Sequence, residues 1–191
     1  MNSYEAALDY LYGFINFEHK SLERYHASKI DPERPRRLLA QLGFPHDTFP
    51  SIHIAGTKGK GSVAAMCAAC LREAGLRVGL YTSPHLREFR ERIRVLTPDD
   101  PVGCIPQAQF VSCLERVRPA VEQTLDITWF EIVTAIAFVH FADSAVDCAV
   151  VEVGLGGRLD ATNVLTPLVS AITSLSLDHT QLLGDTIEQI A

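Results

Sequence analysis

Apolar residues recur along the chain at two spacings, which separate the expected helices from the expected strands. Helical spacing predicts helices at 4–17, 32–42, 63–74, 106–125 and 128–141. Short apolar runs of strand length predict strands at 52–55, 77–81, 146–153 and 168–175. Strands that alternate with helices in this way favour an α/β fold, with a mostly parallel sheet and helices on both faces.

Local capping signals place the ends of the first two expected helices. Asn2 and Ser3 precede the first helix and are residue types that favour the N-cap. Asp31 followed by Pro32 has the form of an N-cap with proline at the first helical position, and Gly43 marks the end of that helix.

The middle of the chain carries a helix breaker and a capping box. Pro119 lies inside the apolar pattern of 106–125, so we expect the helix to kink or restart there. Thr128 and Glu131 have the spacing of a capping box. The almost wholly apolar residues that follow predict a helix buried on both sides.

Four arginines follow the strand at 77–81, and apolar residues interleave with the last of them. These arginines are Arg87, Arg90, Arg92 and Arg94. Alternation with Ile93 and Val95 predicts a short edge strand whose charged face lies in solvent, and we favour this interpretation over an anion-binding cradle.

The composition is that of an acidic globular protein. The 191 residues are 47% hydrophobic, which is enough to fill one sizeable core. A net charge of −6 disfavours a broad nucleic-acid or anionic-membrane surface. The N-terminus carries Glu5 and Asp9 without an apolar signal segment, and no run approaches the roughly 18 apolar residues of a membrane span. We therefore expect a cytoplasmic protein without a membrane or nucleic-acid partner.

The five cysteines favour a reducing compartment over a disulfide framework, because their number is odd and most have apolar neighbours. Cys67 and Cys70 have the spacing of a redox or metal pair. They lack a second pair of ligands, so we interpret them as small hydrophobic residues of a helix.

A glycine-rich stretch with two lysines joins the strand at 52–55 to the following helix. It consists of Gly56, Thr57, Lys58, Gly59, Lys60, Gly61 and Ser62. Such a loop at a helix N-terminus lets backbone N–H groups close on a phosphate, while Lys60 adds a point charge and Ser62 a hydroxyl. The spacing differs from that of the common P-loop, because two residues rather than four separate Gly56 from the Gly59–Lys60 pair. The stretch predicts phosphate binding.

Further polar residues follow three other expected strands. Ser83 lies in the Thr-Ser-Pro-His loop after the second strand, and Glu152 lies near the end of the strand at 146–153. His179 follows the last strand. Open α/β sheets bind ligands at the carboxyl ends of their strands, so these side chains are expected to converge there. The glycines at 154–157 precede no helical run, which argues against a dinucleotide fingerprint.

Five motifs occur in the order typical of one enzyme family. They are G-T-K-G-K-G-S, T-S-P-H, T-W-F-E, E-V-G-L-G-G-R-L-D-A-T-N and L-D-H-T. Over 31–191 the chain resembles the folate branch of the Mur-ligase superfamily, the folylpolyglutamate and dihydrofolate synthases. Lys58 departs from the pattern, since asparagine is usual there. The resemblance implies a P-loop-type Mur-ligase central domain that binds ATP and Mg²⁺.

The resemblance also implies site residues. In the family the glycine loop binds ATP, and the serine, glutamate and histidine that correspond to Ser83, Glu152 and His179 bind magnesium. The implied substrate contacts are Ile30, Asp31, Pro32, Thr128, Phe130, Leu159, Asp160 and Ala161. Several of these residues have an alternative, purely structural role. Ser83 can belong to a simple turn, residues 30–32 can cap a helix, and Thr128 and Phe130 can serve in capping and core packing. His179 has the alternative of orienting a water.

The implied reaction joins L-glutamate to the carboxylate of folate or dihydropteroate with ATP, through an acyl phosphate and without a protein nucleophile. The family continues with a lysine-bearing helix and a C-terminal domain that supplies the adenine and glutamate contacts. We therefore expect 1–191 to be a single, truncated ATP-binding domain with a helical segment at 1–48, without the C-terminal domain. A monomer that is inactive alone is expected.

Two other functions stay open. A P-loop hydrolase or kinase shares the glycine loop and can use Glu152, but that class does not account for Asp178, His179 or the block at 154–163. A non-catalytic nucleotide-binding remnant is the stronger alternative. The sequence does not distinguish dihydrofolate synthase from folylpolyglutamate synthase or from a bifunctional enzyme.

Overall fold

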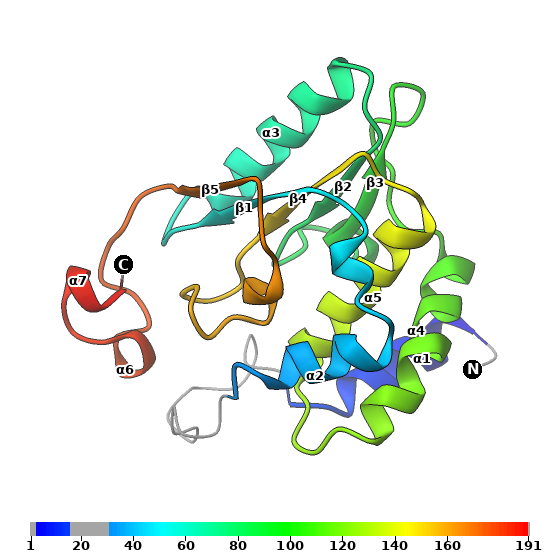
Figure 1. Cartoon of the computed structure of the whole chain (residues 1–191), viewed down its shortest axis with the longest axis horizontal. Helices are drawn as coiled ribbons and strands as arrows, with labels where there is room; N and C mark the ends of the chain where they lie inside the picture. Colours follow the sequence, from blue (N-terminus) through cyan, green and yellow to red (C-terminus); the bar gives the residue numbers. More distant parts are fainter. Residues whose placement is uncertain (1–2, 16–30, 191) are drawn as a thin grey trace.

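The computed structural model describes residues 3–15 and 31–190 and contains one five-stranded sheet. The strands are β1 (Ser51–Ala55), β2 (Val78–Tyr81), β3 (Ile93–Leu96), β4 (Cys148–Glu152) and β5 (Val169–Ile172). Their order is β3-β2-β4-β1-β5, and all neighbours are parallel except β2 and β3. This confirms the predicted mostly parallel sheet and places β3 as an antiparallel edge strand (Figure 1).

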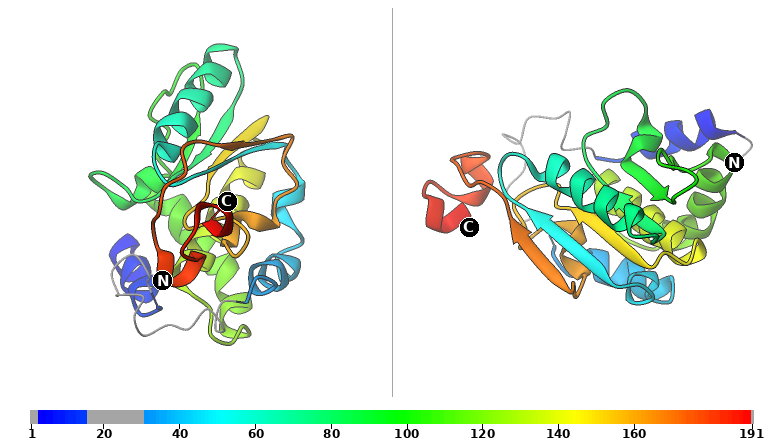
Figure 2. Two further views of the ribbon diagram at one scale, coloured as in Figure 1. Left: turned by 90° about the vertical axis from the view of Figure 1, so that its left-hand side faces the viewer. Right: turned by 90° about the horizontal axis from the view of Figure 1, so that it is seen from above.

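Helices cover both faces of the sheet, as the sequence predicts. They are α1 (Tyr4–Tyr12), α2 (Arg34–Gln41), α3 (Lys60–Glu73), α4 (Gln107–Glu122), α5 (Trp129–Asp143), α6 (Thr180–Leu183) and α7 (Ile187–Ile190). Three short 3₁₀ turns are η3 (Pro45–Asp47), η4 (Phe89–Arg92) and η5 (Ala161–Val164). Figures 1 and 2 show α3 against one face and α5 against the other, with α4 and α1 beyond α5. None of the helices in the described ranges is long and apolar enough to cross a membrane.

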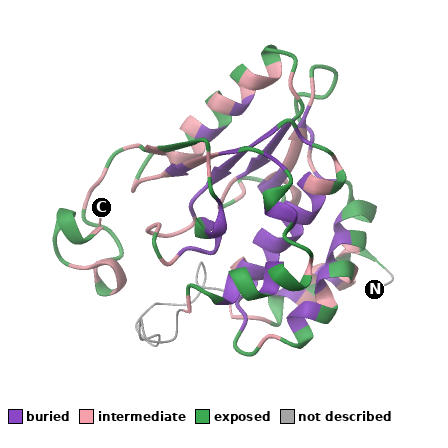
Figure 3. Ribbon diagram, viewed as in Figure 1, coloured by how far each residue is buried: buried purple, intermediate pink, exposed green. Residues whose placement is uncertain are grey.

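The main core lies between the sheet and α5. Nearly every residue of α5 is buried, and Figure 3 shows this helix as the largest continuous buried element. Thr128 caps it, and the predicted capping box with Glu131 is present. Because α5 has apolar side chains on all sides, it packs on the sheet with one face and on α4 with the other. Full burial of a side chain such as Ile136 contributes roughly 1.5–3 kcal/mol.

The first helix is shorter than its apolar pattern predicts. Ser3 caps α1 as expected, its hydroxyl accepting the Ala6 N–H, but the helix ends at Tyr12 with Gly13 as C-cap. Ile15 instead forms an isolated parallel bridge with Thr128. Gly13 keeps a right-handed φ of −68°, and glycine is a poor helix former, so the helix ends here although apolar spacing continues. The last two residues of the predicted helix lie outside the described ranges.

The predicted start of α2 is wrong. Glu33 occupies the N-cap position, and the proline in the first turn is Pro35 rather than Pro32. The Asp31 carboxylate accepts the Glu33 N–H at 3.0 Å and pairs with Arg37, so it forms a turn ahead of the helix. Pro32 and Pro35 lie three residues apart, each shortly after an acidic residue, and local sequence does not choose between them.

Pro119 does not restart the helix that contains it, because α4 runs without a break from Gln107 to Glu122. The ring lies on the exposed side of the helix. Water can therefore satisfy the carbonyl that loses its partner. On the other side Val117, Ala120 and Val121 are buried, and their packing keeps the helix continuous.

The prediction that the arginines in and before β3 face solvent is wrong at one position, the last residue of η4. Arg92 is only 2% exposed. Its guanidinium lies 4.8 Å from the Trp129 ring centroid, and its Nε donates to His85 Nδ1 at 2.9 Å. An aromatic ring that is distant in sequence thus buries the charge through a cation–π contact.

The last strand lies at the edge of the sheet and is shorter than the predicted 168–175. β5 pairs with β1, which separates it from β4. Most of β5 is exposed, including Val169 and Ile172. An edge strand exposes side chains that a central strand of the same composition would bury.

Candidate functional site

The glycine-rich loop lies at the carboxyl edge of the sheet, between β1 and α3. Lys60 is the first residue of α3, and Gly59 is its N-cap. The strand, loop and helix predicted from the sequence are therefore confirmed. At this place the backbone N–H groups of the first turn and the dipole of a fourteen-residue helix favour an anion.

The segment after β5 clamps the first half of this loop. Thr57 N–H donates to the Ser174 carbonyl at 2.7 Å. The Thr57 hydroxyl donates to the Ser176 carbonyl at 3.2 Å and accepts the Ser176 N–H at 3.1 Å. The Thr173 hydroxyl donates to the Lys58 carbonyl at 2.7 Å. The loop is thus bound to the segment that leads to Asp178 and His179.

Glu152 ends β4 directly beneath the start of α3. Its Oε2 accepts the Ser83 N–H at 3.0 Å, and the Gly61 N–H is a second donor. A Cβ at Gly61 would lie 3.3 Å from Oε2, so the glycine allows the carboxylate to approach the helix closely. Burial raises the pKa of Glu152, while the two N–H groups, Lys60 and Arg92 oppose the rise. A buried anion held in this way is a suitable ligand for a hard cation.

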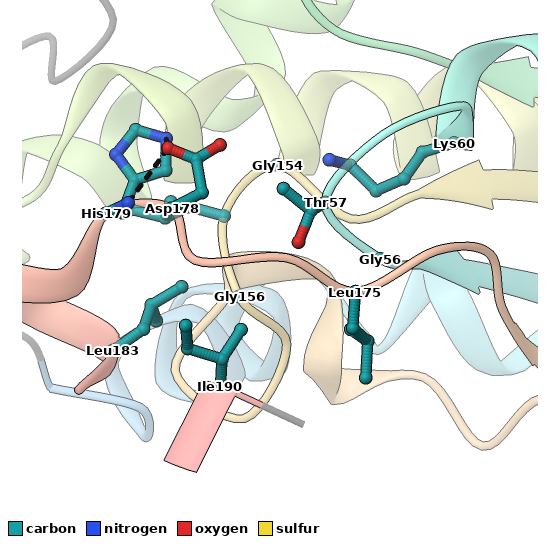
Figure 4. Close-up of a pocket in the computed structure, with 11 residues that line it drawn as sticks. Gly56, Thr57, Lys60, Gly154, Gly156, Leu175, Asp178, His179, Leu183 and Ile190 are labelled. Atoms are coloured by element: carbon teal, nitrogen blue, oxygen red, sulfur yellow. Dashed lines mark hydrogen bonds and ion pairs between the residues drawn. The ribbon is translucent and has the colours of Figure 1, made fainter. Parts of the chain in front are cut away.

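A pocket of about 140 Å³ opens in front of the glycine loop. Gly56, Thr57 and Lys60 form one wall, and the turn at 154–156 forms another. Asp178 and His179 line the pocket together with Leu175, Leu183 and Ile190. In Figure 4 the Lys60 side chain extends toward the side that carries Asp178 and His179, with the 154–156 turn between. The structure thus brings Lys60 and His179 to one cavity.

Of the three predicted metal ligands, two are in direct contact with each other. Ser83 and Glu152 are joined by the hydrogen bond described above. His179 is exposed, has φ of 47° and lies 3.7 Å from the Asp178 carboxylate through its Nε2. Within residues 3–15 and 31–190, no three His, Cys, Asp or Glu side chains form a metal-binding cluster. The carboxylate of Glu152 and the hydroxyl of Ser83 are oxygen donors of the kind Mg²⁺ prefers, so this pair fits the ion better than His179 does.

Thr128 and Phe130 lie at the N-terminus of α5. The Thr128 hydroxyl accepts the Glu131 N–H as part of the helix cap. Thr128 is also buried. Phe130 is partly buried, and its ring packs so closely on Gly154 that a Cβ there would lie 2.5 Å from it. Phe130 is the member of this pair that contacts the loop after β4.

Glu131 also forms a buried ion pair with the start of α2. Arg34 Nε lies 2.8 Å from one Glu131 oxygen and 3.0 Å from the other, and both side chains are 7% exposed. This pair joins the segment that contains Asp31 and Pro32 to α5. The neighbouring Ile30 lies outside the described residues.

The carboxylate of Asp160 accepts hydrogen bonds from residues of its own loop. Oδ2 accepts the Leu155 N–H at 2.9 Å, and Oδ1 accepts the N–H and the hydroxyl of Thr162 at 2.9 and 2.5 Å. Burial raises the pKa of Asp160 against these hydrogen bonds. Of its predicted substrate-binding neighbours, Leu159 is partly exposed and Ala161 is buried.

Two residues that sequence analysis did not select lie close to the site. Arg92 acts on the charge of Glu152, and His53 Nε2 lies 2.7 Å from the Thr162 hydroxyl. A polar residue inside a short apolar strand is the signal that points to His53. Arg92 offers no comparable signal, because its burial depends on the distant Trp129.

Proteins similar to this chain share both its sequence and its fold. No protein-family model matches the chain. A probable bifunctional folylpolyglutamate synthase/dihydropteroate synthase from Haloferax volcanii is 42% identical over 98% of this chain and 21% of its own length. The dihydrofolate synthase/folylpolyglutamate synthase of Bacillus subtilis is 39% identical over 99% of this chain and 42% of its own length.

A solved FPGS–AMPPCP–folate complex has the same fold over 98% of this chain and 44% of its own, with a TM-score of 0.86 and 40% identity. The chain therefore spans less than half the length of each of these proteins. The described strands and helices match the sheet and helices of that fold. Over its 191 residues the chain belongs to the folylpolyglutamate and dihydrofolate synthases, as the counterpart of their N-terminal portion.

Proposed function

We propose that the chain provides the ATP-binding portion of a ligase that joins L-glutamate to the carboxylate of folate or dihydropteroate. ATP, L-glutamate and the pterin-bearing acid are then the small-molecule substrates, and 1–191 is a single, incomplete ATP-binding domain. The relative solved with AMPPCP and folate supports this choice of ligands. A carboxylate is a poor acyl donor, so phosphorylation by ATP would precede attack by the amine of glutamate, giving an amide, ADP and phosphate.

One observation carries the proposal: Lys60 and the N-terminus of α3 adjoin the buried carboxylate of Glu152 at the carboxyl edge of the sheet. Phosphate groups require positive charge and N–H donors, which Lys60 and the N-terminus of α3 supply. A divalent cation on those phosphates requires an oxygen donor, such as the carboxylate of Glu152. The two stand next to each other in this structure.

We assign residues to the reaction accordingly. Residues 56–62 bind the ATP phosphates, with Lys60 facing their charge. Ser83 and Glu152 hold Mg²⁺, which when bound neutralises phosphate charge, and His179 contacts that ion or a water on it. Phe130 and the loop at 159–161 border the pterin-bearing substrate, on the side of the sheet where Phe130 packs on Gly154.

Within this assignment Asp160 acts mainly through its loop. Both of its oxygens already accept hydrogen bonds from residues 155 and 162. The carboxylate therefore orders the substrate-binding loop, and the backbone and apolar side chains of that loop make the contacts. The same reasoning assigns Thr128 to the cap of α5.

Calorimetric titration with Mg-ATP tests the proposal. Substitution Lys60→Ala is expected to weaken binding about tenfold or more, because a charge-assisted contact to phosphate contributes roughly 1.5–3 kcal/mol. Arg36→Ala is the matched control, since it removes one positive charge from an exposed position on α2. Its affinity for Mg-ATP should equal that of the unmodified chain.

Equal affinities of the Lys60→Ala and Arg36→Ala chains would remove Lys60 from the phosphate site. Absence of Mg-ATP binding by the unmodified chain would contradict the proposal for the chain by itself. Thermal denaturation of all three chains shows whether each is folded. Omission of Mg²⁺ from the titration separates the phosphate contacts from those of the ion.

A further inference from the structure

A continuous set of hydrogen bonds links the middle of β1 to the wall of the pocket opposite the glycine loop. His53 Nε2 lies 2.7 Å from the Thr162 hydroxyl, which lies 2.5 Å from Asp160 Oδ1. Asp160 Oδ2 in turn accepts the Leu155 N–H at 2.9 Å. Leu155 lines the pocket between Gly154 and Gly156.

The direction of each hydrogen bond follows from the donors available. Each oxygen of Asp160 accepts a backbone N–H, which identifies the carboxylate as an acceptor. The Thr162 hydroxyl therefore donates its proton to Asp160 and accepts from His53. This requires the proton of a neutral His53 to reside on Nε2.

Burial supports a neutral imidazole at this position. His53 is partly buried on β1 between Val151 of β4 and Ser170 of β5, and Thr162 is fully buried. Burial lowers the pKa of His53 below its usual value. If position 53 served only for core packing, an apolar residue would lose less hydration free energy there than an imidazole does.

Strand β1 therefore supports both walls of the pocket. It continues directly into the glycine loop, and His53 lies three residues before Gly56. Through Thr162 and Asp160 the same strand also holds the turn at 154–156. A shift of one wall relative to the other would change the width of the space that Lys60 faces.

We propose that His53 is a positioning residue, which fixes the 154–156 turn against the glycine loop through Thr162 and Asp160. It touches no ligand itself. The ligand affinities discussed below depend on the proposed ATP-binding function, whereas the backbone measurements do not.

Amide hydrogen exchange with NMR detection tests the proposal without a ligand. In His53→Leu the Leu155 amide is expected to exchange about two- to tenfold faster than in the unmodified chain, as loss of one supporting hydrogen bond implies. His53→Gln can place an N–H donor near the position of Nε2 and should restore exchange to within about twofold. Thr162→Val and Thr162→Ser form a second pair, in which only the serine variant keeps the hydroxyl.

A spectroscopic measurement addresses the tautomer. Long-range proton–nitrogen correlation of the unmodified chain should show His53 protonated on Nε2. Protonation on Nδ1 at neutral pH would reverse the deduced hydrogen bonds and overturn the proposal.

Mg-ATP titration supplies the functional test. We expect His53→Leu to bind Mg-ATP about three- to tenfold more weakly while its melting temperature stays equal or rises, and His53→Gln to bind as the unmodified chain does. Equal weakening in both variants, or unchanged exchange at Leu155 in His53→Leu, would overturn the positioning role. If the unmodified chain binds no Mg-ATP, the proposed function fails, and the exchange data alone decide whether His53 holds the turn.

Discussion

Helix α5 and the edge formed by β5, α6 and α7 are held by different forces. Twelve of the fifteen residues of α5 are buried, and its apolar side chains contact the sheet and α4. No residue of α6 or α7 is buried, and β5 is largely exposed. The pairing of β5 with β1, together with hydrogen bonds from 173–176 to the glycine loop, connects this edge to the rest of the molecule.

The pocket lies between a well-buried region and an exposed one. Its wall at 154–156 follows a fully buried strand, whereas Asp178 and His179 belong to the exposed edge. Hydrophobic burial is broadly distributed over many contacts, while the edge depends on a few directional bonds. Substitutions should therefore affect global stability in the first region and local order in the second.

The largest expected effect comes from one substitution made in each region. Ile136→Ala in α5 should lower the free energy of unfolding by about 2–5 kcal/mol, because a buried side chain is removed and a cavity remains. Ile172→Ala in β5 should change it by about 0.5 kcal/mol or less, because Ile172 is 56% exposed. Urea denaturation of both chains measures the difference. Similar losses in the two variants would contradict the comparison.

A smaller effect is expected from the clamp on the glycine loop. Thr57→Val removes the hydroxyl that binds both backbone groups of Ser176, so local opening of 173–176 should become easier by about 1–2 kcal/mol. Thr57→Ser keeps the hydroxyl and is the control. Amide exchange at Ser176 measures the change, and equal protection in the two variants would show that the hydroxyl does not hold the segment.

The smallest expected effect is a dependence of stability on pH. Burial lowers the pKa of His46, His53 and His140 from the usual 6.5. A histidine with a lowered pKa in the folded state contributes stability that is present above about pH 6.5 and is lost as the pH falls through the folded value. The contribution of these three histidines to the free energy of unfolding should therefore decrease on acidification below about pH 6.5.

His140→Phe isolates one of these histidines, which lies in the buried helix. The variant should lose less stability than the unmodified chain between about pH 7 and pH 5. Glu152 and Asp160, whose pKa values burial raises, contribute in the opposite sense but equally in both chains. Parallel stability curves would show that His140 takes no part in the pH dependence.

The elements whose signals are local and unambiguous were predictable from the sequence. The run from β1 through the glycine loop into α3 combines an apolar strand, glycines and helical spacing, and each feature points the same way. The capping box of Thr128 and Glu131 is similarly self-contained. Convergence of the glycine loop, Ser83 and Glu152 follows from their places after parallel strands.

Features that depend on distant neighbours were not predictable. Burial of Arg92 requires Trp129, and exposure of β5 requires knowledge that no further strand pairs with it in the described structure. The start of α2 was misplaced because Pro32 and Pro35 give equivalent local signals. His53 was missed because its partner Thr162 lies 109 residues away in the chain.

The contact between Gly61 and Glu152 limits how this sequence can vary. A methyl group at 61 would lie 3.3 Å from a carboxylate oxygen of Glu152, which is closer than most contacts of a Cβ atom. An alanine at 61 would require the carboxylate to shift by a few tenths of an ångström, and we expect a larger side chain there to displace it further. Glycine at position 61, directly before Ser62, thus leaves the space that the carboxylate of Glu152 occupies at the start of α3.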